Sequence, residues 1–318
     1  MQLSELTALG VFCSYFSIII ALFGLLCKSL FVGSHSGETY RVYVFVALTA
    51  ASFGHTWFLF CSKSFRPVFM IMQWSFTNYE NLNTTVSNGY ILSRMSRWLI
   101  DTSLFEQAWA RVCFGAVNWW WSQQLCLYTV GAWTILLATE GRRHQTKFIW
   151  AYMLLGQLVA ISVASNLFYL SLVLAKPRPA PQSSAPPVLW IPVLISLGTV
   201  ATSPFTDKHT FLPNLLLMHS LCVIPLLFPD NLFHGRRFCL KITTLYVIVF
   251  AAALAIHTRI TSIALGDPPK SVTEFLGIAW DVLNSHPAQS SICWDVIWTS
   301  LSFIAWIVLQ PEQGTAAY

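Results

Sequence analysis

The sequence predicts an all-α fold, a polytopic integral membrane bundle of about eight transmembrane helices in a single domain. Of the 318 residues, 55% are hydrophobic and only 10% are charged, and the mean hydropathy is +0.60. A typical soluble domain is about one-quarter charged. The apolar residues are also gathered in long runs. These observations argue against a soluble enzyme, a disordered chain and a disulfide-stapled secreted domain.

The long apolar runs set the number of expected helices, because about 20 apolar residues are needed to cross the hydrocarbon of a bilayer. The first run is too long for a signal peptide and lacks a basic leader, so we expect it to be retained. The fifth is the weakest, because Pro192 and Gly198 interrupt it. The windows cover residues 6–32, 42–61, 112–139, 148–174, 188–203, 211–229, 238–262 and 292–310.

Three segments outside the windows have patterns of their own. Apolar and charged residues alternate over residues 90–111, which predicts an amphipathic helix at the membrane interface. A short helix is expected around residues 273–283. The proline-rich segment 176–187 predicts a linker, because proline cannot continue a helix.

The charged residues and the cysteines indicate few partners beyond lipid. The net charge is +5, but the basic residues lie in loops and form no nucleic-acid patch, so we expect no nucleic-acid partner. The eight cysteines form no CxxC pair and lie mostly in apolar runs. We interpret them as small membrane-helix residues, not as a metal site or a disulfide frame.

Asp295 is the first candidate for an acid at membrane depth. Asp295, Thr299, Ser302 and Trp306 follow helical spacing and share one face of the last window. An acid, two hydroxyls and an indole on one stripe would suit the wall of a reaction chamber. The alternative is that Asp295 lies in the first turn of its helix and complements the helix dipole.

Three further acids lie beside aromatic or apolar sequence. Asp101 and Glu106 are five residues apart, so on one helix they point about 140° apart and cannot act as a pair. Asp281 lies in the short helix near the last window. We expect one of Asp101 and Glu106 to face a chamber while the other pairs with Arg97 or Arg111.

Histidines and amides within the windows are the other polar candidates. His55 lies deep in the second window and His219 near the middle of the sixth. Ionisable and amide groups at membrane depth are expensive and often functional, but many simply bond neighbouring helices together. The amide candidates are Asn118, Gln123 and Asn166.

Aromatic residues make up 15% of the chain, and 14 of them are tryptophans. Belts at the membrane interface explain many of these. Three consecutive residues spread over about 200° of a helix, so at most one or two of Trp119, Trp120 and Trp121 can face inward. Ring faces attract cations, and for this role we select Trp119, Trp294 and Trp298.

Motifs for several common chemistries are missing from the sequence. It contains no paired aspartates of the kind that hold Mg²⁺ against a diphosphate. It also has no glycine-rich phosphate loop, kinase motif set or GxSxG elbow. We therefore expect neither a cofactor nor a metal, and chemistry that depends on isolated acids, histidines and aromatics.

Five long runs resemble the fungal membrane-bound terpene cyclases of meroterpenoid pathways, most of all the ascochlorin, ascofuranone and macrophorin type. They are residues 119–133 (WWWSQQLCLYTVGAW), 140–143 (EGRR), 150–172, 214–230 and 285–303 (SHPAQSSICWDVIWTSLSF). The similarity extends from about residue 98 to 307. It implies an eight-helix enzyme that cyclises a farnesyl chain on an aromatic ring. Such an enzyme protonates a terminal epoxide or alkene without a metal, and we expect it in the endoplasmic reticulum membrane.

The resemblance and the residue patterns combine into one hypothesis. A cyclase of this kind needs a buried, protonated carboxylic acid, an apolar chamber and a group that removes the final proton. The acid would be Asp295 or Asp101, with Glu106 and Asp281 in reserve. His55 or His219 would orient the substrate or take the last proton.

Two other classes remain open. A transporter of a hydrophobic metabolite would line a path across the whole membrane with its polar residues, and it would be expected to show internal symmetry. A membrane acyltransferase or other lipid-modifying enzyme would use His219 or His55 as a base.

Overall fold

The computed structural model describes residues 2–33, 39–57, 69–82, 90–102, 104–175, 184–207, 209–228 and 238–310. Side chains at 32–33, 69–74 and 104–107 are not part of this description. Most of the predicted linker, residues 176–183, therefore lies outside the described residues.

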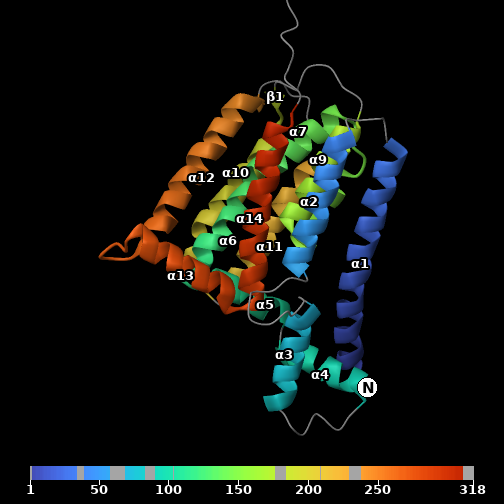
Figure 1. Cartoon of the computed structure of the whole chain (residues 1–318), viewed down its shortest axis with the longest axis vertical. Coiled ribbons are helices and arrows are strands. Elements are labelled where there is room, and N and C mark those ends of the chain that lie inside the picture. The colour runs from blue at the N-terminus through green and yellow to red at the C-terminus, as the bar shows by residue number, and fades with distance from the viewer. Residues whose placement is uncertain are drawn as a thin grey trace, which may run out of the picture.

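The described chain is a bundle of helices with one small strand pair (Figure 1). Strands β1 (Ser184–Ala185) and β2 (Leu240–Lys241) pair antiparallel beside the starts of α10 and α12. The π-helix Thr129–Trp133 joins α6 to α7. The helices are α1 (Leu3–Gly33), α2 (Thr39–Trp57), α3 (Phe69–Leu82), α4 (Ile91–Thr102), α5 (Leu104–Cys113), α6 (Ala116–Tyr128), α7 (Thr134–Arg143), α8 (Ile149–Leu158), α9 (Ile161–Leu174), α10 (Pro187–Thr202), α11 (Phe211–Leu227), α12 (Ile242–Leu265), α13 (Val272–Ser285) and α14 (Pro287–Val308).

Four segments of the described chain are long and apolar enough to cross a membrane: Leu3–Phe31, Pro187–Phe205, Ile242–Leu265 and Pro287–Val308. Their apolar side chains are widely exposed. On α12, Val247 is 66% exposed and Phe250 is 69% exposed. Such surface is costly in water and suits contact with lipid tails. The all-α prediction is confirmed, and these helices indicate an integral membrane protein.

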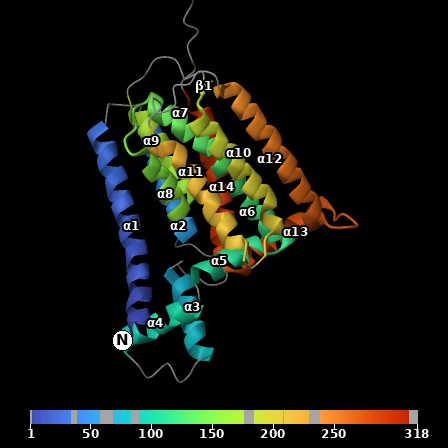
Figure 2. The ribbon, with the colours of Figure 1, turned by 180° about the vertical axis from the view of Figure 1, so that it is seen from behind.

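Helix α9 forms the centre of the bundle. Its residues from Ile161 to Leu170 are all buried, and it packs against α2, α8 and α14. Helices α1 and α12 lie on opposite sides of this centre, as two views of the ribbon show (Figures 1 and 2). Helix α12 approaches the π-helix closely at Gly131, where an added Cβ would meet Val249 Cγ1 at 2.6 Å.

The window over residues 148–174 does not form the continuous helix that was predicted. Helix α8 ends at Leu158 and α9 starts at Ile161. Between them, Ala160 is extended, with φ −170° and ψ 140°. The prediction of one helix was therefore wrong here.

The predicted interfacial helix over residues 90–111 is also divided, into α4 and α5. Helices α3 and α4 lie at the end of the bundle where α1 begins (Figure 1). There, Arg97 of α4 forms an ion pair with Glu5 at 3.7 Å. The short helix expected around residues 273–283 is confirmed as α13.

Candidate functional site

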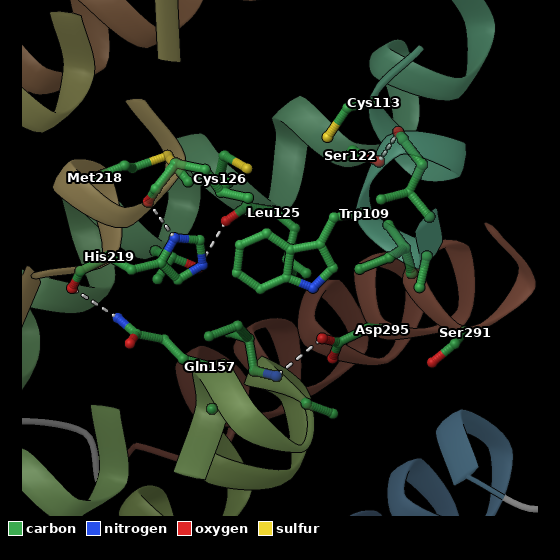
Figure 3. Close-up of a pocket in the computed structure, with 18 of the residues that line it drawn as sticks. Trp109, Cys113, Ser122, Leu125, Cys126, Gln157, Met218, His219, Ser291 and Asp295 are labelled. Carbon is green, nitrogen blue, oxygen red and sulfur yellow. Dashed lines mark hydrogen bonds between the residues drawn. The ribbon is translucent and has the colours of Figure 1, made fainter. Parts of the chain in front are cut away.

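A cavity of about 270 Å³ lies among α5, α6, α11, α14 and the break between α8 and α9 (Figure 3). Its size is near the lower end of the range of about 300–1,000 Å³ for small-molecule pockets. Most of its lining is apolar. The polar side chains that line it are Ser122, Thr129, Gln157, His219, Ser291 and Asp295.

Two carbonyls at the end of α8 beside this cavity accept hydrogen bonds from distant side chains. The Tyr15 hydroxyl donates to the Leu158 carbonyl at 2.7 Å. The Trp57 indole N–H donates to the Val159 carbonyl at 3.1 Å. Irregular backbone is tolerated at membrane depth only where it is buried in protein or lines a cavity, and both conditions hold here.

The start of α9 is satisfied by Asp295 of α14. The backbone N–H of Ile161 donates to Asp295 Oδ2 at 2.8 Å, and that of Ser162 donates to Oδ1 at 2.7 Å. The side chain is only 4% exposed. Asp295 thus caps a helix that is more than 130 residues away in the sequence.

This contact changes the interpretation of the predicted stripe. Asp295, Thr299 and Ser302 are buried together, as their shared face predicted. Of the stripe, only Asp295 is among the residues that line the cavity, and Trp306 stacks on Tyr169 at 4.9 Å. Asp295 is not in the first turn of α14, which begins at Pro287. The helix N-terminus that it caps is that of α9, not that of its own helix.

His219 of α11 lies in the cavity beside Trp109 of α5. The two rings stack with centroids 5.1 Å apart and planes 25° apart (Figure 3). His219 Nδ1 lies 2.8 Å from the Leu215 carbonyl oxygen. Because a carbonyl oxygen only accepts, we assign the proton to Nδ1, which leaves Nε2 with a free lone pair. Gln157 donates to the His219 carbonyl at 3.1 Å.

The other predicted acids are not part of this cavity as described. Asp101 of α4 is exposed and accepts a hydrogen bond from the Tyr79 hydroxyl. Asp281 of α13 is also exposed. The burial that the acid hypothesis requires is therefore missing at both positions. The Glu106 side chain lies outside the described residues.

The second predicted histidine belongs to a separate cluster between α2 and α14. Trp298 donates its indole N–H to His55 Nδ1 at 2.8 Å. Trp294 stacks on the His55 ring at 4.7 Å. None of these three side chains is among those that line the cavity.

The predicted amides connect helices to one another, as the packing interpretation allows. None of the three lines the cavity as described. Trp119 is also buried away from it, at 6% exposure. The amide pairs are Asn118 with Gln289 at 2.9 Å, Gln123 with His257 at 2.5 Å and Asn166 with Ser52 at 3.5 Å.

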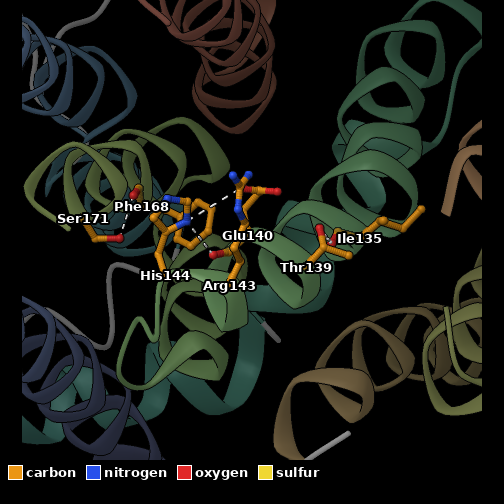
Figure 4. A network of polar contacts seen from close by, with 7 residues as sticks. All are labelled: Ile135, Thr139, Glu140, Arg143, His144, Phe168 and Ser171. Carbon is orange, nitrogen blue, oxygen red and sulfur yellow. Dashed lines mark hydrogen bonds and ion pairs between the residues drawn. The ribbon is translucent and has the colours of Figure 1, made fainter. Parts of the chain in front are cut away.

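The EGRR run forms a polar cluster at the end of α7 (Figure 4). Glu140 forms ion-pair contacts with Arg143 at 3.1 Å and with His144 at 3.6 Å. Arg142 donates to the Pro225 and Phe228 carbonyls at the end of α11, at 2.6 and 2.7 Å. These contacts join the ends of two helices, which is a structural role.

Sequence reasoning missed several residues of the cavity. Trp109 lay in the segment predicted to be interfacial, and nothing in its pattern distinguished it. Ser122 and Thr129 share a polar face of the third window, but were not selected as site residues. Three cysteines also line the cavity: Cys113, Cys126 and Cys222.

The fold and the cavity define a helical integral membrane protein with a mainly apolar internal pocket. Comparisons with protein-family models, curated proteins and solved structures find no match to this chain. The geometry of the cavity therefore provides the evidence on function.

Proposed function

We propose that this protein is an integral membrane terpene cyclase. It cyclises the farnesyl chain of a prenylated aromatic by protonating a terminal epoxide or alkene, without a metal. In this proposal the chain crosses the endoplasmic reticulum membrane eight times. Four of these crossings are the long apolar segments described above. The other four are α2, the helical segment that runs from α6 through the π-helix to α7, the consecutive helices α8 and α9, and α11.

One observation carries the proposal: a single carboxylate, Asp295, borders a largely apolar cavity. It is the one acid among the described residues that line this cavity. Each Asp295 oxygen accepts one backbone N–H, but a carboxyl oxygen has two lone pairs. The Thr299 hydroxyl also approaches Oδ1, at 3.5 Å, so the proton has most room on the second lone pair of Oδ2.

Cyclisation begins when the Asp295 proton is transferred to the substrate. Transfer to an epoxide oxygen breaks one C–O bond, gives an alcohol and leaves a tertiary carbocation. The electron pair of a neighbouring alkene then closes a ring and moves the positive charge along the chain. With a terminal alkene, the proton goes to carbon and leaves the same kind of cation.

The rest of the cavity suits such a cation. Apolar walls exclude water, which would otherwise capture the cation, and they hold the chain in a folded conformation. The Trp109 ring borders the cavity, and an indole face attracts positive charge without forming a bond to it.

The broken helix raises the question of a transporter, because many transporters bind substrate at such breaks. In those proteins the free N-terminus of a half-helix faces an anionic substrate. Here the chain's own Asp295 occupies the N-terminus of α9. This occupation argues against an anion-transport site at the break.

The proposal is tested with microsomes from a heterologous host. Farnesylated phenols with and without a terminal epoxide are incubated with EDTA, and the products are analysed by mass spectrometry. We expect an isomer of unchanged mass, and its loss in Asp295→Asn while the matched variant Asp281→Asn stays active. Absence of an isomer from every substrate would overturn the proposal. Transfer of an acyl group from an added thioester would favour the acyltransferase class.

A further inference from the structure

We propose that His219 ends the reaction by accepting a proton on Nε2. This inference rests on the proposed function and assigns the base of the same cavity. The step breaks a C–H bond next to the cationic carbon, and its electron pair becomes the new C=C bond. The proton moves to Nε2, so one proton enters and one leaves, and the product is an isomer of the substrate.

The Nε2 atom of the His219 ring is the nitrogen that is available to accept a proton. His219 is the one imidazole among the described residues that line the cavity. Its Nδ1 is used by the Leu215 carbonyl at 2.8 Å, and no partner of Nε2 is found in the described part of the chain. A neutral imidazole with its proton on Nδ1 presents a basic lone pair at Nε2.

The partners of the His219 ring stabilise it once it is charged. A hydrogen bond from a cationic donor is roughly twice as strong as one between neutral groups, so the bond to Leu215 gains strength on protonation. The Trp109 face, 5.1 Å away, attracts the imidazolium. Both contacts therefore favour the state that forms when the proton is taken.

The His219 ring is held in place before the reaction. The Leu215 carbonyl fixes one edge and Trp109 covers one face, while Gln157 holds the backbone carbonyl of His219 at 3.1 Å. A general base must be oriented toward the proton that it removes. Two of these contacts hold the ring, and the third holds the backbone that carries it.

His55 provides the matched control. It is also stacked on a tryptophan, but its Nδ1 accepts from Trp298, and it lies outside the cavity lining. Its role in the structure is a contact between α2 and α14. Substitution of His55 should therefore leave the products of the reaction unchanged.

The experiment compares the products of the wild type, His219→Gln and His55→Gln in ¹⁸O-labelled water. General base catalysis contributes about 10²–10⁴-fold, so we expect the wild-type alkene product to fall by roughly 100-fold in His219→Gln. Substrate is still consumed, because protonation is intact. The cation is then captured by water and yields labelled alcohols, or loses its proton at another carbon. His55→Gln should give the wild-type products.

The outcomes separate this inference from the proposed function. If His219→Gln forms the wild-type alkene at the wild-type rate, the inference is overturned and the cyclase stands. If His55→Gln shifts the products in the same way, the assignment to His219 is also overturned. If the wild type isomerises no substrate, the cyclase proposal fails and the inference fails with it.

A second measurement avoids dependence on the folding of a variant. Wild-type protein is treated with diethyl pyrocarbonate, which acylates imidazole nitrogens, and the modified histidines are located by mass spectrometry. We expect modification of His219 to shift the products toward labelled alcohols, and a saturated farnesyl phenol to slow it. Unchanged products from protein fully modified at His219 would overturn the inference.

Discussion

Asp295 should matter for stability independently of any catalytic role. Asp295→Ala removes both acceptors from the first backbone N–H groups of α9, which are buried. Each buried N–H that is left without an acceptor costs about 1–3 kcal/mol, so loss of both acceptors costs about 2–6 kcal/mol. Asp295→Asn keeps one carbonyl oxygen and should cost about half as much. Thr299 contacts Asp295 only at 3.5 Å, so Thr299→Val should cost less than about 1 kcal/mol.

The assay is thermal unfolding of purified protein in one detergent, followed by the loss of the monodisperse peak. About 1 kcal/mol shifts the midpoint by roughly 2–4 °C in large domains. Asp295→Ala should therefore unfold at least about 4 °C below the wild type. The exposed Asp281→Ala variant is the control and should unfold at the wild-type temperature.

The result also decides how an inactive Asp295 variant is interpreted. If Asp295→Ala unfolds at the wild-type temperature, the cap does not hold α9 and the reasoning is refuted. If Asp295→Asn is partly destabilised but still folded at the assay temperature, its loss of activity reports on the proton itself.

Three other expectations concern single contacts. Trp57→Phe removes the donor to the Val159 carbonyl beside the end of α8. It should cost about 1–3 kcal/mol of stability, measured by thermal unfolding. A tryptophan-to-phenylalanine change at a lipid-exposed position should leave the unfolding temperature unchanged. Gly131→Leu should cost about 1–3 kcal/mol or more by the same assay, because a Cβ there meets a Val249 methyl at 2.6 Å, and Val249→Ala should restore part of the loss. Hydrogen bonds from the Thr210 hydroxyl and nearby backbone N–H groups lower the pKa of Asp207 below its ordinary value. Asp207 therefore stabilises the fold above a pH of about 3.9, and this contribution is lost as the pH falls through the folded-state pKa, so Asp207→Ala should flatten the acid side of the unfolding curve. An equally steep acid side in this variant would contradict that expectation.

The sequence predicted the helices well where local hydropathy determines them. Helices α1, α10, α12 and α14 coincide closely with apolar windows, because an uninterrupted apolar run of that length has few other stable conformations. Pro192 interrupts the fifth window in sequence, yet it lies inside α10. Proline in a membrane helix is tolerated where neighbouring groups satisfy the freed carbonyl.

The break between α8 and α9 could not be predicted from local sequence. Residues 148–174 are mostly apolar, and the groups that stabilise the break come from distant parts of the chain. Tyr15 and Trp57 supply donors from α1 and α2, and Asp295 supplies the acceptors from α14. Hydropathy windows contain no information about such partners.

The candidate site was predicted only in part, for a related reason. Helical spacing placed Asp295 on a buried face, but spacing does not show which buried face borders a cavity. His55 and His219 look alike in sequence, since both lie deep in apolar windows. Only the packing of α11 against α5 and α8 distinguishes them, because it places His219 beside Trp109 in the cavity.

The function proposed for this protein is isomerisation of a prenylated aromatic without a metal. The most direct measurement uses purified protein in EDTA with a farnesylated phenol that carries ¹⁸O in a terminal epoxide. We predict a cyclic product of unchanged mass that keeps the label as a hydroxyl oxygen. Recovery of the unchanged substrate from folded protein, or product formation that requires an added metal, would contradict the proposed function.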